Sequence, residues 1–235
     1  MAADEKLYFQ IRNAIEAFVR VNNRLECDGE ENIPGAGGAL ICPPHANYSD
    51  PFFIGAAIRG RVIHFLAWHG IAEMPVVGPL FKRMGTMHSI EESYGVALNK
   101  EQAREVLGGL RALLEQGELC CLFPEGAIKH WINPTGDALK EFKPGAVRLA
   151  AEAGVPIIPA GITGARWVMP NVINLYDYGG PDKGVWAPLA LPVKVKVRFG
   201  EPFYPDPACA TDPEARLAET ERLKQTMAAI MESMK

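Results

Sequence analysis

Residues 39–53 read ALICPPHANYSDPFF, an apolar stretch followed by a polar loop and then by the start of a second apolar segment. The stretch 39–43 has the length and composition of a fully buried β-strand. Asp50 followed by Pro51 is a typical start of a helix. A buried strand that brings His45 and Asp50 to its end is typical of a parallel sheet that binds its ligand at the carboxyl edge.

The rest of the chain repeats this alternation of strands and helices, which predicts an α/β fold with a mostly parallel central sheet flanked by helices. We expect one domain over residues 1–235, with an N-terminal amphipathic helix within 1–22 and an irregular aromatic-rich loop at 164–192. Asp212 and Pro213 should begin the closing helix. Strands are predicted at 24–29, 39–43, 61–68, 86–89, 118–123, 155–161 and 193–199, and helices at 4–22, 51–60, 76–85, 99–117, 143–154 and 212–235.

Composition narrows the class of protein. The 235 residues are 48% hydrophobic and 22% charged with a net charge of −4, so we expect no nucleic-acid partner. Cys42, Cys120 and Cys121 sit in apolar runs, which predicts reduced core residues in a cytosolic protein. There is no signal-peptide pattern and no apolar stretch of the ~18 residues that span a bilayer. We therefore expect a cytoplasmic protein that is soluble or peripheral on the membrane.

Three loops follow apolar strands and carry residues suited to chemistry: PPHANYSD (43–50), LFPEGA (122–127) and IIPAG (157–161). Ligands of parallel sheets bind beyond the carboxyl ends of the strands, because loops and helix N-termini converge there. The three loops should therefore share one pocket, although they are far apart in sequence.

His45 and Asp50 allow two interpretations. A neutral imidazole can take a proton from a hydroxyl group, and a carboxylate on its other ring nitrogen fixes the tautomer and stabilises the imidazolium that forms. Alternatively, Asp50 only caps the helix that begins at Pro51, and His45 is an incidental loop residue. A carboxylate has enough lone pairs to serve both purposes.

The sequence contains no G-x-S-x-G elbow that would supply a serine nucleophile. If His45 acts as a base, the hydroxyl that it activates must then come from the substrate. This pattern favours direct acyl transfer from a thioester to an alcohol.

HANYSD (45–50), followed by FPEG (123–126) and FKPGAVRLAAEAGVPIIPAGI (142–162), resembles the glycerolipid and lysophospholipid acyltransferase family, which includes the 1-acylglycerol-3-phosphate acyltransferases. The signatures of this family are H-x4-D and an F-P-E-G block, and both occur here in the family's order. MPVVGPLFKRMGTM (74–87) and VRFGEPF (197–203) add to the likeness, which covers about residues 25–203.

The resemblance implies that His45 is the general base and that Asp50 orients it. It also implies that Glu125 and Gly126 line the acceptor site, with Phe123 and Pro124 shaping the turn. A purely structural turn, in which proline and glycine supply only backbone geometry, is the alternative for this block. Glu125 argues against that alternative, because a buried carboxylate needs a partner.

The sequence departs from the family where relatives of the phosphate-using type carry cations. Trp68, Ile128 and Glu91 stand where the family tends to place Lys, Arg and Arg, and none of them can imitate the bidentate fork of arginine on a phosphate. We therefore expect poor activity on lysophosphatidic acid and better activity on an acceptor without a terminal phosphate. The nearby cations that can contact substrate from shifted positions are Lys82, Arg83 and Lys129.

The resemblance further implies an acyl donor, either acyl-CoA or acyl carrier protein, and a lipid or lipophilic alcohol as acceptor. It implies a role in lipid metabolism on the cytoplasmic face of the membrane, and the amphipathic N-terminal helix and the aromatic residues of 164–192 suit such a surface. We expect no cofactor and no metal, because the histidines lack metal-ligand spacing.

Two other functions remain open at this stage. The same dyad can activate water, which would make the protein a thioesterase. Alternatively, the chain is a non-catalytic module that binds acyl lipids. A separate question concerns Lys194, Lys196 and Arg198, which share one face of VKVKVRF (193–199) and indicate either a charged edge strand or a contact for anionic phosphates.

Overall fold

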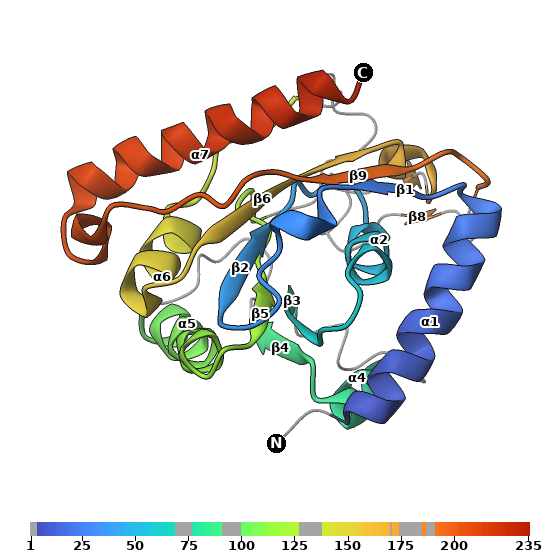
Figure 1. Ribbon diagram of the computed structural model, residues 1–235, viewed down its shortest axis with the longest axis horizontal. Helices are drawn as coiled ribbons and strands as arrows, with labels where there is room; N and C mark the ends of the chain where they lie inside the picture. The colour runs from blue at the N-terminus through green and yellow to red at the C-terminus, as the bar shows by residue number, and fades with distance from the viewer. Residues whose placement is uncertain are drawn as a thin grey trace.

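The computed structural model of the chain is a central β-sheet between two layers of helices (Figure 1). The structure describes residues 4–68, 77–90, 100–126, 138–169, 171–173, 185–186 and 191–235. Its helices are α1 (Glu5–Asn22), α2 (Asp50–Ala57), α4 (Val77–Met84), α5 (Lys100–Glu115), α6 (Gly145–Ala153) and α7 (Pro213–Ser233). Its strands are β1 (Glu26–Asp28), β2 (Ala39–Cys42), β3 (Ile63–Trp68), β4 (Met87–Ile90), β5 (Leu119–Cys121), β6 (Ile157–Thr163), β7 (Asn171–Ile173), β8 (Val185–Trp186) and β9 (Lys196–Phe199).

In the described part of the chain, the main sheet has seven strands in the order β1-β9-β6-β2-β5-β3-β4. The strands from β6 to β4 pair in parallel, whereas β9 runs antiparallel to β6 and β1 pairs in parallel with β9. The sheet is therefore mostly parallel. This observation confirms the predicted fold class, including the helices on both faces and the N-terminal helix.

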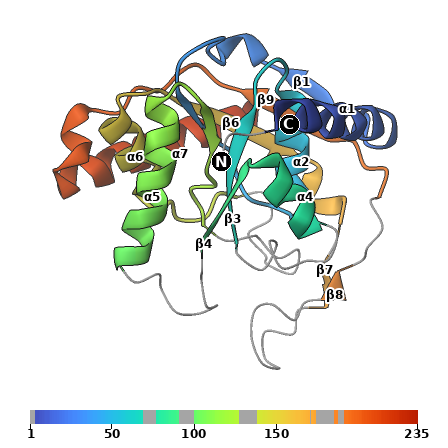
Figure 2. The same ribbon diagram turned by 90° about the horizontal axis from the view of Figure 1, so that it is seen from below.

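The side chains of β2 explain why the sheet is covered on both sides. Ala39 and Ile41 belong to one buried cluster, and Leu40 and Cys42 belong to the other. Successive side chains of a strand point to opposite faces, so an uninterrupted apolar strand needs a helical layer on each face. Helices α1, α2 and α4 cover one face, and α5, α6 and α7 cover the other (Figures 1 and 2).

The ends of two helices follow from local hydrogen bonds. The carboxylate of Asp4 accepts a hydrogen bond from the amide of Leu7 (3.0 Å) at the start of α1. At the start of α7, Asp212 accepts one from the amide of Glu214 (2.9 Å), with Pro213 in the first turn. The predicted start of the closing helix is confirmed.

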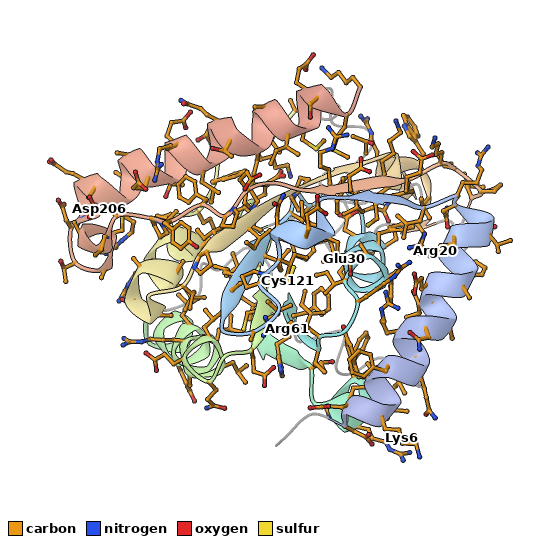
Figure 3. The ribbon with its side chains drawn as sticks, viewed as in Figure 1. Lys6, Arg20, Glu30, Arg61, Cys121 and Asp206 are labelled. Atoms are coloured by element: carbon orange, nitrogen blue, oxygen red, sulfur yellow. The ribbon has the colours of Figure 1, made fainter. Side chains whose placement is uncertain are left out.

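Arg61 organises the amino-terminal edge of the sheet (Figure 3). Its guanidinium donates to the backbone oxygens of Pro34 (2.8 Å), Gly37 (2.9 Å) and Gly117. These residues precede β2 and β5, so a single side chain fixes the starts of two neighbouring strands. Both strands then emerge at the opposite, carboxyl edge in a defined register.

The interpretation of VKVKVRF as an edge strand is wrong. Strand β9 lies between β1 and β6, because the short strand β1 pairs along its outer side. The charges on this face pair across to β1 instead: Lys194 contacts Glu26 (2.5 Å) and Arg198 contacts Asp28 (3.1 Å).

The predicted irregular segment 164–192 contains a short 3₁₀ helix, η2 (Ala165–Trp167), and the antiparallel pair of β7 and β8. Residues 170, 174–184 and 187–190 lie outside the described residues. Among the helices that the structure describes, none is both long enough and apolar enough to cross a membrane.

The predicted reduced core cysteines are confirmed. Cys42, Cys120 and Cys121 are free thiols with no exposed surface, and Cys121 lies at the centre of the sheet in Figure 3. Burial raises the pKa of the Cys120 thiol to about 12, with Glu118 adding to the shift. A thiol in this state is not a nucleophile near neutral pH.

Candidate active site

The candidate site is formed by the loops that leave β2, β5 and β6. The prediction of IIPAG (157–161) as the third loop is wrong, because these residues lie inside β6 and the chain leaves that strand at Gly164. These three strands are adjacent and parallel, in the order β6-β2-β5, so their carboxyl ends lie together at one edge of the sheet. The loop 43–50 leaves the middle strand and is flanked by the other two. The location agrees with the general rule for ligand sites in parallel sheets.

The structure brings His45 and Asp50 together. Nδ1 of His45 lies 3.0 Å from Oδ2 of Asp50. Asp50 is fully buried, whereas the His45 side chain keeps 16% of its surface exposed. A carboxylate at Nδ1 favours the tautomer with the proton on that nitrogen, which leaves Nε2 as the acceptor for a substrate proton.

Asp50 also holds the shape of the loop. Its Oδ2 accepts hydrogen bonds from the amides of Ala46 and Asn47, both at 2.7 Å. The residue at the N-cap of α2 is Ser49, whose side chain makes no capping hydrogen bond. The carboxylate thus points back toward the loop 43–50 rather than serving as a conventional cap, and its charge is further stabilised by its position in the first turn of α2.

Glu125 connects the FPEG turn to the histidine. The carboxylate accepts the backbone amide of His45 at Oε1 (3.2 Å) and the amide of Lys140 at Oε2 (3.2 Å). Only 4% of Glu125 is exposed. These contacts place the predicted residue beside the dyad, with its charge engaged by backbone donors.

Phe123 contacts the histidine ring directly. The two rings are stacked, with their centroids 4.0 Å apart and their planes 21° from parallel. Stacking and the hydrogen bond to Asp50 together restrict the rotation of the imidazole. The sequence indicated Phe123 only as part of a turn, and this ring contact was not foreseen.

The rest of the FPEG block forms a tight turn. The amide of Gly126 donates to the backbone oxygen of Phe123 (3.0 Å), and Gly126 has a φ of 67°, a conformation that favours glycine. Pro124 is buried, and its backbone oxygen accepts the amide of Lys143 (2.8 Å). The turn is therefore braced by the segment that precedes α6.

Asn47 is a site residue that sequence reasoning missed. Its Nδ2 donates to the backbone oxygen of Met169 (2.8 Å) and lies 3.4 Å from that of Arg166, beyond the end of β6. Its Oδ1 accepts from the amide and hydroxyl of Ser49, both at 3.0 Å. A polar residue within HANYSD was the available signal, but the distant partners could not be read from the sequence.

The structure describes only part of the other predicted substrate contacts. Lys82 and Arg83 are exposed on the last turn of α4. Trp68 is the last residue of β3. Ile128 and Lys129 lie outside the described residues, as does Glu91.

No group of three or more potential metal ligands gathers in the portion of the chain that the structure describes.

Comparison with known proteins assigns the class. The model of the Acyltransferase family matches residues 24–163, which include the loops of His45 and Glu125. The chain belongs to the Acyltransferase family.

Two relatives illustrate the range of the family. The chain is 28% identical to an uncharacterized protein of Mycobacterium leprae (strain TN), over 95% of this chain and 63% of that protein. It is 24% identical to the 1-acyl-sn-glycerol-3-phosphate acyltransferase of Bacillus subtilis (strain 168), over 93% of this chain and 94% of that protein. The chain thus spans nearly the whole length of the Bacillus enzyme but less than two thirds of the mycobacterial protein.

The fold has a counterpart among solved structures. The crystal structure of the 1-acyl-sn-glycerophosphate (LPA) acyltransferase PlsC from Thermotoga maritima matches with a TM-score of 0.65 at 20% identity. The match covers 98% of this chain and 83% of the other. At this identity the likeness establishes the fold.

Proposed function

We propose that this acyltransferase moves a fatty acyl group from an acyl thioester to the hydroxyl of a lysolipid or another lipophilic acceptor. The observation that carries the proposal is the 3.0 Å contact of His45 Nδ1 with the buried carboxylate of Asp50 at the carboxyl edge of the sheet. This pair provides a base for a hydroxyl group. Family membership supplies the reaction class.

In the proposed reaction, His45 moves one proton from the acceptor hydroxyl to the leaving thiolate. His45 Nε2 takes the proton of the acceptor hydroxyl while the oxygen attacks the thioester carbonyl. The tetrahedral intermediate collapses and the carbon–sulfur bond breaks. The thiolate that leaves takes the proton from the imidazolium of His45. The products are an ester and a free thiol, and Asp50 stabilises the imidazolium that forms between the two steps.

The state of the cysteines supports direct transfer without an acyl-enzyme. Burial raises the pKa values of the thiols of Cys42 and Cys121, the two that lie closest in sequence to the catalytic loops. Desolvation also raises the pKa of Cys27 to about 12. A nucleophilic cysteine needs the opposite shift, so these thiols are suited to packing and not to catalysis.

The names of relatives favour a lysolipid as acceptor. The Bacillus relative and the Thermotoga structure are both named as acyltransferases for 1-acylglycerol phosphates. For this chain we retain the expectation of a head group without a terminal phosphate, because Trp68, Ile128 and Glu91 replace cationic residues of the family. The donor is acyl-CoA or acyl carrier protein.

We also propose that the protein works on a membrane surface. Exposed apolar side chains lie near the C-terminal end of α1 and around η2, and these elements are joined by hydrogen bonds. Asn23 Nδ2 donates to the backbone oxygen of Leu191 (2.9 Å). The amide of Leu191 in turn donates to the backbone oxygen of Val168 (2.8 Å). We call this set the apolar rim; its members are Phe18 (55% exposed), Val21 (84%), Trp167 (46%) and Leu191 (39%).

The apolar rim is close to the catalytic loop through Asn47, which contacts Met169 two residues after Trp167. Arg166 lies over the Trp167 ring, 4.9 Å from its centroid, so a cation accompanies the aromatic side chain. Aromatic rings beside arginine suit the interface between lipid head groups and acyl chains. A lipophilic acceptor would then reach His45 from the bilayer.

A product assay tests the reaction. Purified protein is incubated with a long-chain acyl-CoA or acyl carrier protein and a panel of lysolipids and neutral alcohols, and free thiol, free fatty acid and acylated lipid are measured. We expect thiol release that depends on the acceptor and matches the acylated lipid. Free fatty acid formed without an acceptor would identify a thioesterase, and binding without thiol release would identify a lipid-binding module.

A further inference from the structure

Lys143 carries an ammonium group at the FPEG turn that the described site does not use. Its backbone amide donates to the oxygen of Pro124 (2.8 Å), which fixes the residue beside the turn. Its side chain then crosses over Gly126: a Cβ on that glycine would lie 2.6 Å from Lys143 Cε and 2.8 Å from Nζ. The absence of a side chain at Gly126 therefore makes room for the lysine.

The anchoring of Lys143 is firm on both sides. Phe142 is buried in the core with 8% of its surface exposed, and Pro144 restricts the backbone just before α6. The lysine side chain is exposed between these two fixed residues. Its position beside the turn is thus set by the fold rather than by a charged partner.

Among the residues that the structure describes, no neighbour neutralises the charge of Lys143. Within the described part of the chain, no hydrogen bond or ion pair engages its ammonium group. Glu125, the carboxylate nearest in the turn, is directed inward to the amides of His45 and Lys140. Glu141 contacts Lys224 instead (2.8 Å). Within the described residues, Lys143 is therefore a cation without a charged partner, and it lies over Gly126, the residue next to Glu125.

We propose that Lys143 binds a phosphate ester of the substrate at the mouth of the active site. This inference rests on the proposed acyl transfer. Two substrate groups share this chemistry: the phosphopantetheine arm of the acyl donor, which coenzyme A and acyl carrier protein have in common, and the phosphate of a lysophospholipid acceptor. Recognition of the acceptor phosphate by Lys143 would overturn the expectation of a head group without a terminal phosphate, whereas recognition of the donor is compatible with it. An ammonium group binds phosphate as a mobile point charge, so it tolerates either arrangement.

The test compares substrates with and without the phosphate. We prepare the variants Lys143→Met and Lys143→Arg. The control is Lys6→Met, which removes one exposed lysine near the start of α1 (Figure 3). KM is measured for acyl-CoA against acyl-pantetheine, and for lysophosphatidic acid against monoacylglycerol. We expect Lys143→Met to raise KM by about tenfold for the phosphate-bearing member of one pair only, with kcat little changed. Lys143→Arg should keep KM for that substrate close to the wild-type value.

The pair that responds identifies the source of the phosphate: the first pair points to the donor and the second to the acceptor. An equal change in KM for both members of each pair, or no change at all, would overturn the proposal. Calorimetric titration of coenzyme A and of lysophosphatidic acid into wild type and Lys143→Met measures the same contact without turnover. A protein that binds phosphate through Lys143 but transfers no acyl group would contradict the proposed function and leave this inference standing.

Discussion

The dyad shows how much one buried carboxylate can determine. Asp50 Oδ2 contacts the Nδ1 atom of His45 and accepts hydrogen bonds from two backbone amides of the loop, so one group fixes the orientation of the imidazole and the path of the chain. Removing it would change both. For this reason a loss of activity in an Asp50 variant has to be compared with its effect on stability.

Asn47 provides a test of how the loop is held. Asn47→Ala removes the hydrogen bonds to Met169 and Ser49 while leaving the backbone amide that serves Asp50. We expect kcat to fall by about 10- to 100-fold, because small displacements of a catalytic group are costly. Initial rates and a thermal melt on each variant provide the measurement.

Ser49→Ala is the matched control, since it removes only the hydroxyl that bonds to Asn47 Oδ1. We expect a clearly smaller loss of kcat. Equal kcat values for wild type and a folded Asn47→Ala variant would show that the link to the end of β6 does not position the loop.

At the residue scale, the sequence predicted which residues would line the candidate site better than it predicted which other residues would contact them. His45, Asp50 and Glu125 drew attention because they follow apolar strands, but the roles predicted for them came from the resemblance to the acyltransferase family. The stacking of Phe123 on His45 and the reach of Asn47 to Met169 join segments far apart in the chain. Such contacts depend on strand order, which no local pattern contains.

Helix α2 is held at both ends by charge. Asp50 begins it, and at the other end the buried Arg12 of α1 donates to the backbone oxygens of Ala56 (2.5 Å) and Ile58 (3.0 Å). A cation at a helix C-terminus satisfies carbonyls that have no partner in the helix. The N-terminal helix therefore helps to hold the helix on which the dyad depends.

Glu16 extends this arrangement and gives it a pH dependence. Burial by itself raises the pKa of Glu16, but hydrogen bonds from Arg59, Arg20 and Arg12 together lower it to about 2 (Arg20 is marked in Figure 3). The pKa of Glu16 is therefore lower in the folded protein, about 2, than its ordinary value of 4.5 in the unfolded chain. The ionised carboxylate stabilises the folded protein fully at pH values above 4.5, and this stabilisation is lost as the pH falls from 4.5 toward about 2.

We therefore expect Glu16→Gln to lower the free energy of unfolding at neutral pH by about 1 kcal/mol, the scale of a partly exposed ion-pair network. The difference from wild type should shrink as the pH is lowered from 4.5 toward 2. Urea unfolding across this range measures it, with Glu201→Gln as a control, because no ion pair engages that exposed carboxylate among the described residues. A difference that stays constant with pH would contradict this account of Glu16.

At the element scale, periodicity predicted most of the helices and strands. It did not predict that β1 would pair along the outer side of β9. The alternation of VKVKVRF indicated a strand with a charged face, and charge on a strand usually marks an edge. Strand β1 has only three residues, two of them acidic, and its parallel pairing with β9 is accompanied by ion pairs from Lys194 to Glu26 and from Arg198 to Asp28. Complementary charge between distant segments is not visible in either segment alone.

The whole molecule combines a rigid sheet with a surface suited to lipid. The apolar rim and the catalytic loop meet where the chain leaves β6, so membrane contact and catalysis would share one side of the protein. Hydrogen bonds through Asn23 and Leu191 link the end of α1 to the segment that follows β6. This arrangement is the basis of the proposal that the protein meets its acceptor at a membrane surface.

Vesicle binding tests the role of the rim. The double variant Phe18→Ala and Trp167→Ala removes two exposed rings, and we expect its partition coefficient on anionic phospholipid vesicles to fall by about tenfold or more. Sedimentation with the vesicles measures the bound fraction. Leu217→Ala, on the exposed face of α7, is the control and should bind like wild type. Equal binding of the double variant and wild type would place the membrane contact elsewhere.

The central claim is that His45, oriented by Asp50, is the base for acyl transfer to a lipid hydroxyl. The most direct measurement is the initial rate of acylated lipid formation by His45→Ala and Asp50→Asn beside wild type, with thermal melts to show that each variant is folded. We predict that His45→Ala lowers this rate by about 10²- to 10⁴-fold without loss of the fold, and that Asp50→Asn is similarly impaired. A folded His45→Ala variant that forms acylated lipid at a near-normal rate, or an Asp50→Asn variant that loses only thermal stability, would contradict it.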